Sequence, residues 1–163
     1  MARPAEAQGR GAHGAGAGRE KLGLVETRRA ELVEAFERTF YWVEGPDGRF
    51  ALRVEERSPE LEALLRREGA SRWVYLTAVN PAARLQGQAD NDRTSRELRA
   101  ELYARGLVFF EGESVAERGD WPSEPSLLVL ELDEDEARAL GRRFSQAAVL
   151  VGELGGAPRL VWL

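Results

Sequence analysis

Residues 73–79 read Trp-Val-Tyr-Leu-Thr-Ala-Val, and residues 127–132 read Leu-Leu-Val-Leu-Glu-Leu. Both runs are apolar on the two alternating faces of an extended chain, a pattern typical of strands that are buried on both sides. Such strands lie in the middle of a sheet, where other strands flank them. The two runs therefore predict the centre of the fold.

Predicted helices alternate with these strands. A helix over 92–105 carries Leu98 and Leu102 one turn apart, and a second helix begins at Asp133 with Glu136 as its capping-box partner. The predicted order is strand 73–79, helix 92–105, strand 107–110, strand 127–132, helix 133–144 and strand 148–151. This β-α-β-β-α-β order is that of the ferredoxin-like split βαβ motif, so we predict an α+β fold with this core. A three-layer α/β sheet is the alternative.

Further elements flank this core. They are predicted as a helix over 24–39, a hairpin over 40–54 with its turn at 45–48, a helix over 59–68 and an extra strand over 159–162. Ser58 as the N-cap and Gly69 as the C-cap define the ends of the second of these helices. Because the central strands are apolar on both faces, we expect the N-terminal helix and the hairpin, or a second subunit, to cover the face opposite the core helices.

Composition narrows the class of protein. The chain has 163 residues, 43% of them hydrophobic and 31% charged, which suits one globular domain. We predict a disordered Ala/Gly-rich tail over residues 1–20 and a single globular domain over 21–163. The chain has no cysteine, no apolar run long enough to span a membrane and no secretory signal pattern, so we expect a soluble cytoplasmic protein without membrane contact. The net charge of -5 disfavours nucleic acid as a partner.

The histidine content excludes several kinds of chemistry. The only histidine is His13, which lies in the predicted tail. Catalysis by a Ser-His-Asp triad, a histidine general base and a histidine-based metal site therefore have no partner in the folded part. Acid–base chemistry would have to use Asp, Glu or Tyr. The chain also contains neither a Walker A pattern nor a suitably placed GxGxxG, and we expect no cofactor and no metal site.

The first candidate site is the loop from Thr77 to Asn91. It connects a buried strand with a helix N-terminus and is longer than the roughly 2–6 residues usual for such loops. Asn80 and Asn91 supply polar side chains, and Arg93 in the first helical turn would favour a bound anion at the helix N-terminus. In the simpler interpretation, neighbouring aspartates pair with Arg93 and cap the helix, and Asn80 before a proline opens a turn.

The second candidate site is the proline-stiffened loop over 120–126, which contributes Trp121, Glu124 and Ser126. Glu124, with Asp120 as the second choice, is the candidate acid–base residue. Gln146, between a helix and a strand, is the third candidate site. The simpler interpretations are that Trp121 covers the edge of the core, that Glu124 is solvated or paired with an arginine, and that Gln146 binds loop backbone.

The predicted topology brings these three loops to one end of the sheet, as in a ligand pocket. We therefore predict a binding domain, with catalysis left open, for a small polar or anionic ligand such as an anionic metabolite or nucleotide. The alternative is a non-enzymatic protein–protein interaction or regulatory module, with a homodimer or a protein partner formed through an apolar sheet face or an edge strand.

Separated motifs of this chain also occur, in the same order, in a known family. They are Tyr75-Leu76-Thr77-Ala78-Val79-Asn80-Pro81, Asn91 before a helix, Trp121-Pro122-Ser123-Glu124-Pro125-Ser126-Leu127 and Leu140-Gly141-Arg142-Arg143-Phe144-Ser145-Gln146. Over about residues 40–163 the chain resembles the domain of unknown function 3293 family. The resemblance implies a small bacterial cytosolic protein, and it brings no activity, cofactor or catalytic residue with it. Two positions depart from the family pattern: Ala147 follows Gln146 where Asn is usual, and Thr94 stands where a basic residue is frequent.

Overall fold

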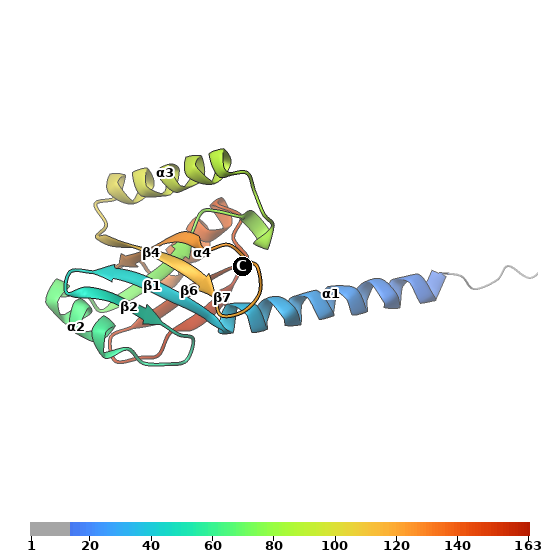
Figure 1. Cartoon of the computed structure of the whole chain (residues 1–163), viewed down its shortest axis with the longest axis horizontal. Coiled ribbons are helices and arrows are strands. Elements are labelled where there is room, and N and C mark those ends of the chain that lie inside the picture. Colours follow the sequence, from blue (N-terminus) through green and yellow to red (C-terminus); the bar gives the residue numbers. More distant parts are fainter. Residues whose placement is uncertain (1–13) are drawn as a thin grey trace, which may run out of the picture. The chain divides into compact units, whose positions relative to one another are not determined.

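The computed structural model describes residues 14–163 (Figure 1). The chain divides after Glu34 into two units, and the described part of the first is helical. Helix α1 spans Gly14–Glu37, whereas the sequence predicted a start near Leu24. Good helix formers such as Ala, Arg and Glu precede the first apolar residues and extend the helix toward the N-terminus. The predicted disordered tail falls on residues 1–13, which lie outside the described residues, and on the first turns of α1.

The second unit, Ala35–Leu163, is built on one seven-stranded sheet. Its strands are β1 Thr39–Gly45, β2 Gly48–Leu52, β3 Arg72–Thr77, β4 Phe109–Ala116, β5 Glu124–Leu130, β6 Ala148–Glu153 and β7 Arg159–Trp162. They are ordered β2-β1-β4-β5-β3-β6-β7, and every neighbouring pair is antiparallel. The helices of this unit are α2 Pro59–Glu68, α3 Gln88–Ala104 and α4 Glu134–Arg143, with a short 3-10 helix η1 at Pro81–Ala83. The predicted α+β class is therefore confirmed.

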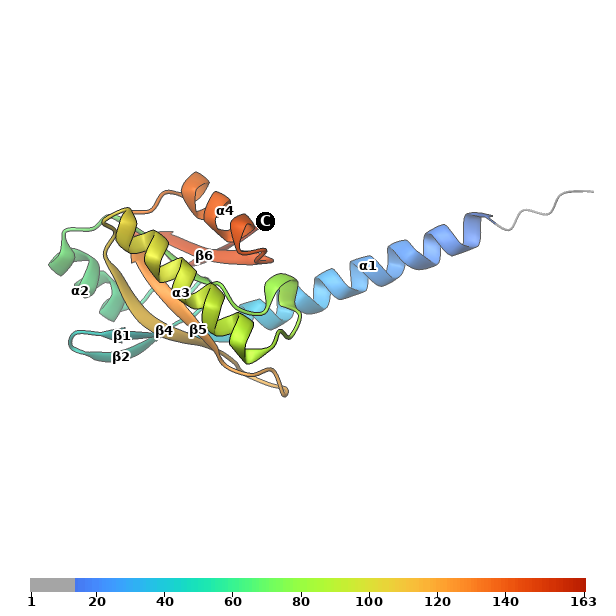
Figure 2. The same ribbon diagram turned by 90° about the horizontal axis from the view of Figure 1, so that it is seen from above.

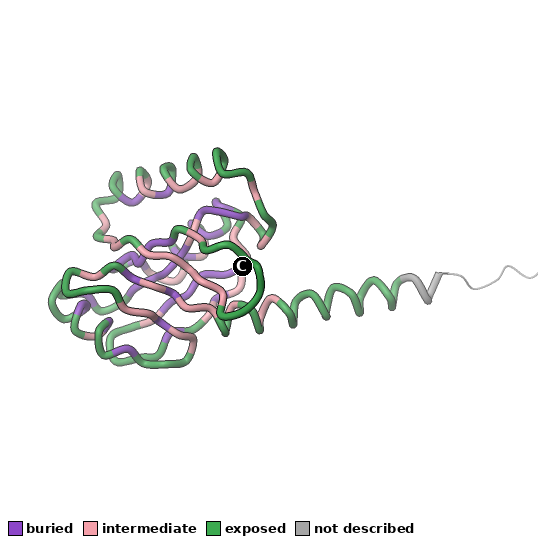
Figure 3. The backbone as a smooth tube through the Cα atoms, in the orientation of Figure 1, coloured by how far each residue is buried: buried purple, intermediate pink, exposed green. Residues whose placement is uncertain are grey.

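The sheet has a core on each face. On one face, the apolar residues of β3, β5 and β6 pack with α3 and α4. On the other face, α2 packs against residues of β1, β2, β3 and β5. Figures 1 and 2 show α2, α3 and α4 around the sheet, and Figure 3 shows the buried segments concentrated along its strands. As predicted, β3 and β5 are central and buried on both faces.

The second face differs in part from the prediction. The hairpin contributes Tyr41, Val43 and Leu52 to its core, as expected, but α2 supplies the covering helix where the sequence suggested the N-terminal helix or a second subunit. The sheet is also curled, since the Glu55 backbone N–H, just beyond β2, donates to the Pro158 carbonyl, just before β7, at 2.8 Å. The two ends of the strand order therefore meet, and the second core lies inside the curl.

Two helices begin as their sequences predict. The Ser58 side chain accepts a hydrogen bond from the Leu61 N–H at the start of α2, and Gly69 ends that helix in the left-handed conformation. Asp133 and Glu136 form a reciprocal capping box at the start of α4. Each of these caps satisfies backbone groups that the helix end would otherwise leave unpaired, and it fixes where the helix begins.

Strand β4 extends well beyond the predicted 107–110 and continues through polar residues to Ala116. The reason is pairing: residues 39–43 of β1 bind along residues 112–116 of β4. Gly112 permits this close approach, because a Cβ atom there would lie 2.0 Å from the Trp42 carbonyl oxygen. The length of β4 is set by its backbone hydrogen bonds to β1, which do not depend on apolar side chains. Polar residues are therefore tolerated in this strand.

Helix α3 also departs from its prediction, since it begins at Gln88 and not near Asp92. Asn91 therefore lies inside the first turns of the helix, and the preceding loop is shorter than expected. Among the residues that the structure describes, no helix is long and apolar enough to cross a membrane.

Candidate functional site

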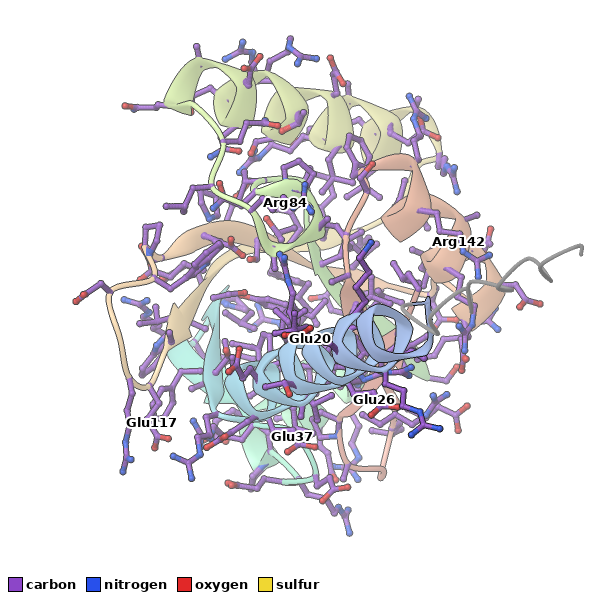
Figure 4. All side chains as sticks on the ribbon, turned by 90° about the vertical axis from the view of Figure 1, so that its right-hand side faces the viewer. Glu20, Glu26, Glu37, Arg84, Glu117 and Arg142 are labelled. Atoms are coloured by element: carbon purple, nitrogen blue, oxygen red, sulfur yellow. The ribbon has the colours of Figure 1, made fainter. Side chains whose placement is uncertain are left out.

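Polar side chains from three segments meet where β3 ends and β5 begins. We call the residues Asn80, Gln86, Asn91, Trp121 and Glu124 the Glu124 cluster. The Asn80 Nδ2 donates to Glu124 Oε1 at 2.8 Å, and the Trp121 Nε1 donates to the same oxygen at 3.0 Å. Two loops that are far apart in sequence are thus joined through a single carboxylate oxygen. Figure 4 marks these two loops by one labelled residue each: Arg84, just after η1, lies in the loop that contains Asn80, and Glu117 lies in the β4–β5 connection that contains Trp121.

Backbone donors fix the orientation of both asparagine amides. The Gln86 N–H donates to Asn80 Oδ1 at 3.0 Å, so the Asn80 amide must turn its NH2 group toward Glu124. In the same way, the Asn80 N–H donates to Asn91 Oδ1, and the Asn91 Nδ2 donates back to Asn80 Oδ1, both at 3.0 Å. Asn80 is only 5% exposed. Within the cluster its side-chain oxygen accepts two hydrogen bonds and one of its two amide hydrogens is donated, so only the second amide hydrogen is left without a partner there.

The backbone around Asn80 is held in an unusual conformation. Six non-glycine residues of the described chain have positive φ, and four of them gather here: Asn80, Ala82, Ala83 and Ser145. The left-handed conformation costs roughly 1–2 kcal/mol for an ordinary L-residue, and asparagine tolerates it better than alanine. The Ala82 N–H donates to the Ser145 carbonyl at 2.7 Å, which ties this loop to the connection between α4 and β6.

Gln146 holds the same region from the third loop. Its Nε2 donates to the Val79 carbonyl at 3.1 Å and to the Phe144 carbonyl at 3.2 Å. The residue thus joins the site through the backbone next to Asn80, and its amide is used for positioning, which is the simpler of the two roles predicted for it.

The electrostatics of Glu124 set it apart from the surface acids. Burial raises the pKa of its carboxyl above the usual value, and the hydrogen bonds from Asn80 and Trp121 oppose that rise. Both donors are neutral, and no arginine or lysine of the described chain forms an ion pair with this carboxylate. A half-buried carboxyl with a raised pKa and no cationic partner is the kind of group that is enriched at functional sites.

Two predicted site residues lie beside the cluster but bind backbone. The Thr77 hydroxyl donates to the Pro125 carbonyl at 2.6 Å and accepts from the Val79 N–H. The Ser126 hydroxyl donates to the Glu124 carbonyl at 2.9 Å and lies 2.9 Å from the Ser114 hydroxyl. These contacts fix the paths of β3 and β5 as they enter the site.

Two other predicted residues lie apart from the cluster. Arg93 is exposed on α3 and forms ion pairs of 3.2 Å with Asp90 and Glu97, which raise the pKa of its guanidinium. This agrees with the simpler interpretation of that arginine, although the helix N-cap is Gly87 without a side-chain cap. Asp120 is exposed in the β4–β5 connection. The sequence did not single out Gln86, and its place in the loop before Asn91 was the only available signal.

Residues 76–149 match the family model described as "Protein of unknown function (DUF3293)". This segment is similar to the DUF3293 family. The resemblance seen in the sequence is thereby confirmed over a narrower range than the expected 40–163. The matched DUF3293 segment runs from β3 into β6 and contains every residue of the Glu124 cluster and Gln146. No curated protein and no solved structure matched the chain.

Proposed function

We propose that the Glu124 cluster binds a small polar ligand that presents a cationic or hydrogen-bond-donating nitrogen to the Glu124 carboxylate. The observation that carries the proposal is a half-buried carboxylate supported by neutral donors alone. Removing a carboxylate from water is costly unless a partner compensates it, and a cationic ligand would supply that partner.

The positions of the donors indicate where the ligand would bind. Asn80 and Trp121 both use Oε1, and no residue of the described chain donates to the second oxygen, Oε2. Trp121 is 38% exposed and donates from its indole to the carboxylate, so it links Glu124 to the protein surface. An ammonium or amide nitrogen at Oε2 would complete the coordination of the carboxylate.

An anionic ligand has less support in this arrangement. The sequence suggested Arg93 as the residue that would bind an anion. Its guanidinium is already paired with Asp90 and Glu97 on the exposed face of α3. The Glu124 carboxylate would also repel an anion. We therefore restrict the proposal to neutral and cationic ligands.

Glu124 is also the residue to which we assign proton transfer if the bound ligand reacts. A raised carboxyl pKa brings the group closer to neutral pH, which favours general acid–base catalysis. Asp120, the second candidate from the sequence, is exposed and makes no contact with the cluster that would give it such a role.

We further propose that β3 to β6, with α3 and α4, form a ferredoxin-like split βαβ core. The strand order β4-β5-β3-β6 within the sheet, its antiparallel pairing and the packing of both helices on one face support this topology. In this arrangement the end of β3 lies beside the starts of β5 and β6, at the end of the sheet where the cluster is found.

The alternative function, an interaction module, would need an exposed apolar sheet face or edge. The aromatic pair Phe40 and Trp42 on β1 is the nearest approach to such a surface. Arg53 and Arg49 cover these rings at 4.2 and 4.5 Å from the ring centroids. Because the chain's own arginines occupy this face, we favour ligand binding over docking.

A ligand-binding experiment tests the proposal. The full chain would be melted at pH 7.5 with methylammonium, ethanolammonium and 1,4-diammoniobutane, and with acetate and phosphate at matched ionic strength. A ligand at about 100 times its dissociation constant adds about 2.7 kcal/mol of stability. We expect the ammonium compounds to raise the melting temperature, and acetate and phosphate to have no such effect.

Two matched variants locate the effect. Glu124→Gln keeps the oxygen that accepts from Asn80 and Trp121 but removes the charge, and it should abolish the shift. Glu117→Gln removes a carboxylate from the same β4–β5 connection and should retain it. The proposal fails if phosphate stabilises the protein more than the ammonium compounds, or if Glu124→Gln responds as the wild type does.

A further inference from the structure

A cavity of about 340 Å³ lies at the opposite end of β3 from the Glu124 cluster. Its walls come from the start of β3, the end of β6, the beginning of α4 and the β6–β7 connection. Its volume falls at the lower end of the range of about 300–1,000 Å³ that is typical of small-molecule sites. The cavity shares no residue with the Glu124 cluster, so it would be a separate site.

The floor of the cavity is apolar and its rim is charged. Arg72 and Val74 alternate along β3, and Val151 and Glu153 alternate along β6, so all four side chains point to the face that α4 covers. Val74 and Val151 belong to the core beneath α4. Arg72 and Glu153 lie further out, where the strands leave the core.

The two rim charges face each other without pairing. Arg72 and Glu153 are direct partners in the β3–β6 register, a position where opposite charges normally attract. Arg72 instead forms an ion pair with Glu131 at 3.7 Å, and the Glu131 carboxylate is also bound by the backbone N–H groups of Ser71 and Arg72. The Glu153 side chain makes no hydrogen bond or ion pair within the part of the chain that the structure describes. A cation held by one long ion pair and an anion without a partner among the described residues thus lie side by side on one rim.

We propose that this cavity binds a small zwitterion of the α-amino acid class. The ligand carboxylate would bind the Arg72 guanidinium, its ammonium group would bind the Glu153 carboxylate, and an apolar side chain would rest on Val74 and Val151. At about 30 Å³ for each water-sized group, the cavity has room for roughly eleven such groups, enough for an amino acid with a branched aliphatic side chain.

Calorimetric titration of the full chain carrying Glu124→Gln with L-leucine tests the proposal, because this background removes the ammonium site proposed at the Glu124 cluster. Three related compounds separate the parts of the proposal. Glycine lacks the apolar side chain, isopentylammonium lacks the carboxylate and 4-methylpentanoate lacks the ammonium group. We expect L-leucine to bind, and each single-charge analogue to bind at least tenfold more weakly. The proposal is overturned if L-leucine does not bind at 10 mM, or if either analogue binds equally well.

Variants assign the binding to this cavity. Glu153→Gln and Arg72→Gln should each weaken L-leucine binding at least tenfold, and Glu153→Gln serves as the safer test because that side chain supports no other contact. Arg66→Gln, on the exposed surface of α2, should leave the titration unchanged. Unchanged binding in Glu153→Gln would refute the placement in this cavity.

Discussion

Asn80→Asp is the substitution that most directly tests the geometry of the Glu124 cluster. The variant is nearly isosteric, and its Oδ1 still accepts from the Gln86 N–H and the Asn91 amide. The change replaces the group that donates to Glu124 at 2.8 Å with an oxygen, so a charged hydrogen bond becomes a contact between two carboxylates. We expect a strong loss of stability near neutral pH.

The magnitude follows from two contributions. Losing a hydrogen bond to a charged group costs about 1.5–3 kcal/mol. Two unit charges at 2.8 Å repel by up to about 6 kcal/mol at an effective dielectric constant of 20, which is a ceiling because the pair can take up a proton. We therefore expect Asn80→Asp to lower the free energy of unfolding by about 3–5 kcal/mol at pH 7.5.

The pH dependence gives the sharper criterion. In the variant, repulsion raises the pKa of the carboxyl pair in the folded state above its value in the unfolded chain. Stability from such a group is present at low pH and is lost as the pH rises through the folded-state pKa, so most of the deficit should disappear at pH 5. Urea unfolding at both pH values measures this. An equal deficit at pH 5 and pH 7.5 would refute the reasoning.

A second variant serves as the control. When Asn80→Asp is combined with Glu124→Gln, the new glutamine can place its NH2 group at the position of Oε1 and donate to the new aspartate, although Trp121 then loses its acceptor at that position. Donor and acceptor are thereby exchanged and one charge remains. The double variant should be more stable at pH 7.5 than Asn80→Asp alone, although it carries one more substitution. If the effects of the two substitutions simply add, Asn80 and Glu124 are not coupled as their 2.8 Å contact implies.

Three further predictions concern the same protein. Because burial raises the folded-state pKa of Glu124, its contribution to the stability of the wild type should fall as the pH rises above the ordinary carboxyl value of 4.5; thermal melts of Glu124→Gln should show a smaller decline, and equal declines would contradict that assignment. Ala82→Gly should raise the free energy of unfolding by about 0.5–1 kcal/mol, because Ala82 is exposed and has a φ of 53°. A lower free energy of unfolding in this variant would show that the Ala82 backbone is unstrained. Gly112→Ala should lower the free energy of unfolding in urea by at least about 3 kcal/mol, because its Cβ would lie 2.0 Å from the Trp42 carbonyl oxygen. An unchanged free energy of unfolding would mean that β1 and β4 can separate freely.

The sequence predicted those parts of the fold that local patterns determine. Ser58 and Gly69 define the ends of α2, and the Asp133–Glu136 capping box defines the start of α4, because caps depend on residues within one turn. The length of β4 was missed because it depends on pairing with a distant hairpin, and that pairing has no local signature. The start of α3 was missed because its N-cap, Gly87, contributes no side-chain hydrogen bond.

For the candidate site, sequence reasoning named four of the five residues of the Glu124 cluster but missed Gln86, and it also included Arg93 and Asp120, which lie apart. Asn80, Asn91, Trp121, Glu124 and Gln146 do meet, because they lie at strand ends that the sheet topology brings to one edge. Which side chains bind backbone and which bind one another depends on side-chain distances, and no spacing in the sequence encodes them. Arg93 illustrates the limit: its position in the chain suggested an anion site, but its pairing with Asp90 and Glu97 depends on the exposed helix face.

Two features of the Glu124 cluster oppose stability, and together they favour function over architecture. Ala82 and Ala83 hold left-handed conformations that glycine would adopt at lower cost, and Glu124 is half-buried without a cation. A region under selection for stability alone would relieve both, for example with a glycine in the loop and a glutamine at position 124. Strained backbone and uncompensated charge in native proteins cluster at ligand-binding and catalytic sites, where the surrounding structure holds them in place. Here that structure is the hydrogen-bonded frame of Asn80, Asn91 and Gln146, which fixes the carboxylate at the place where we propose that a ligand binds.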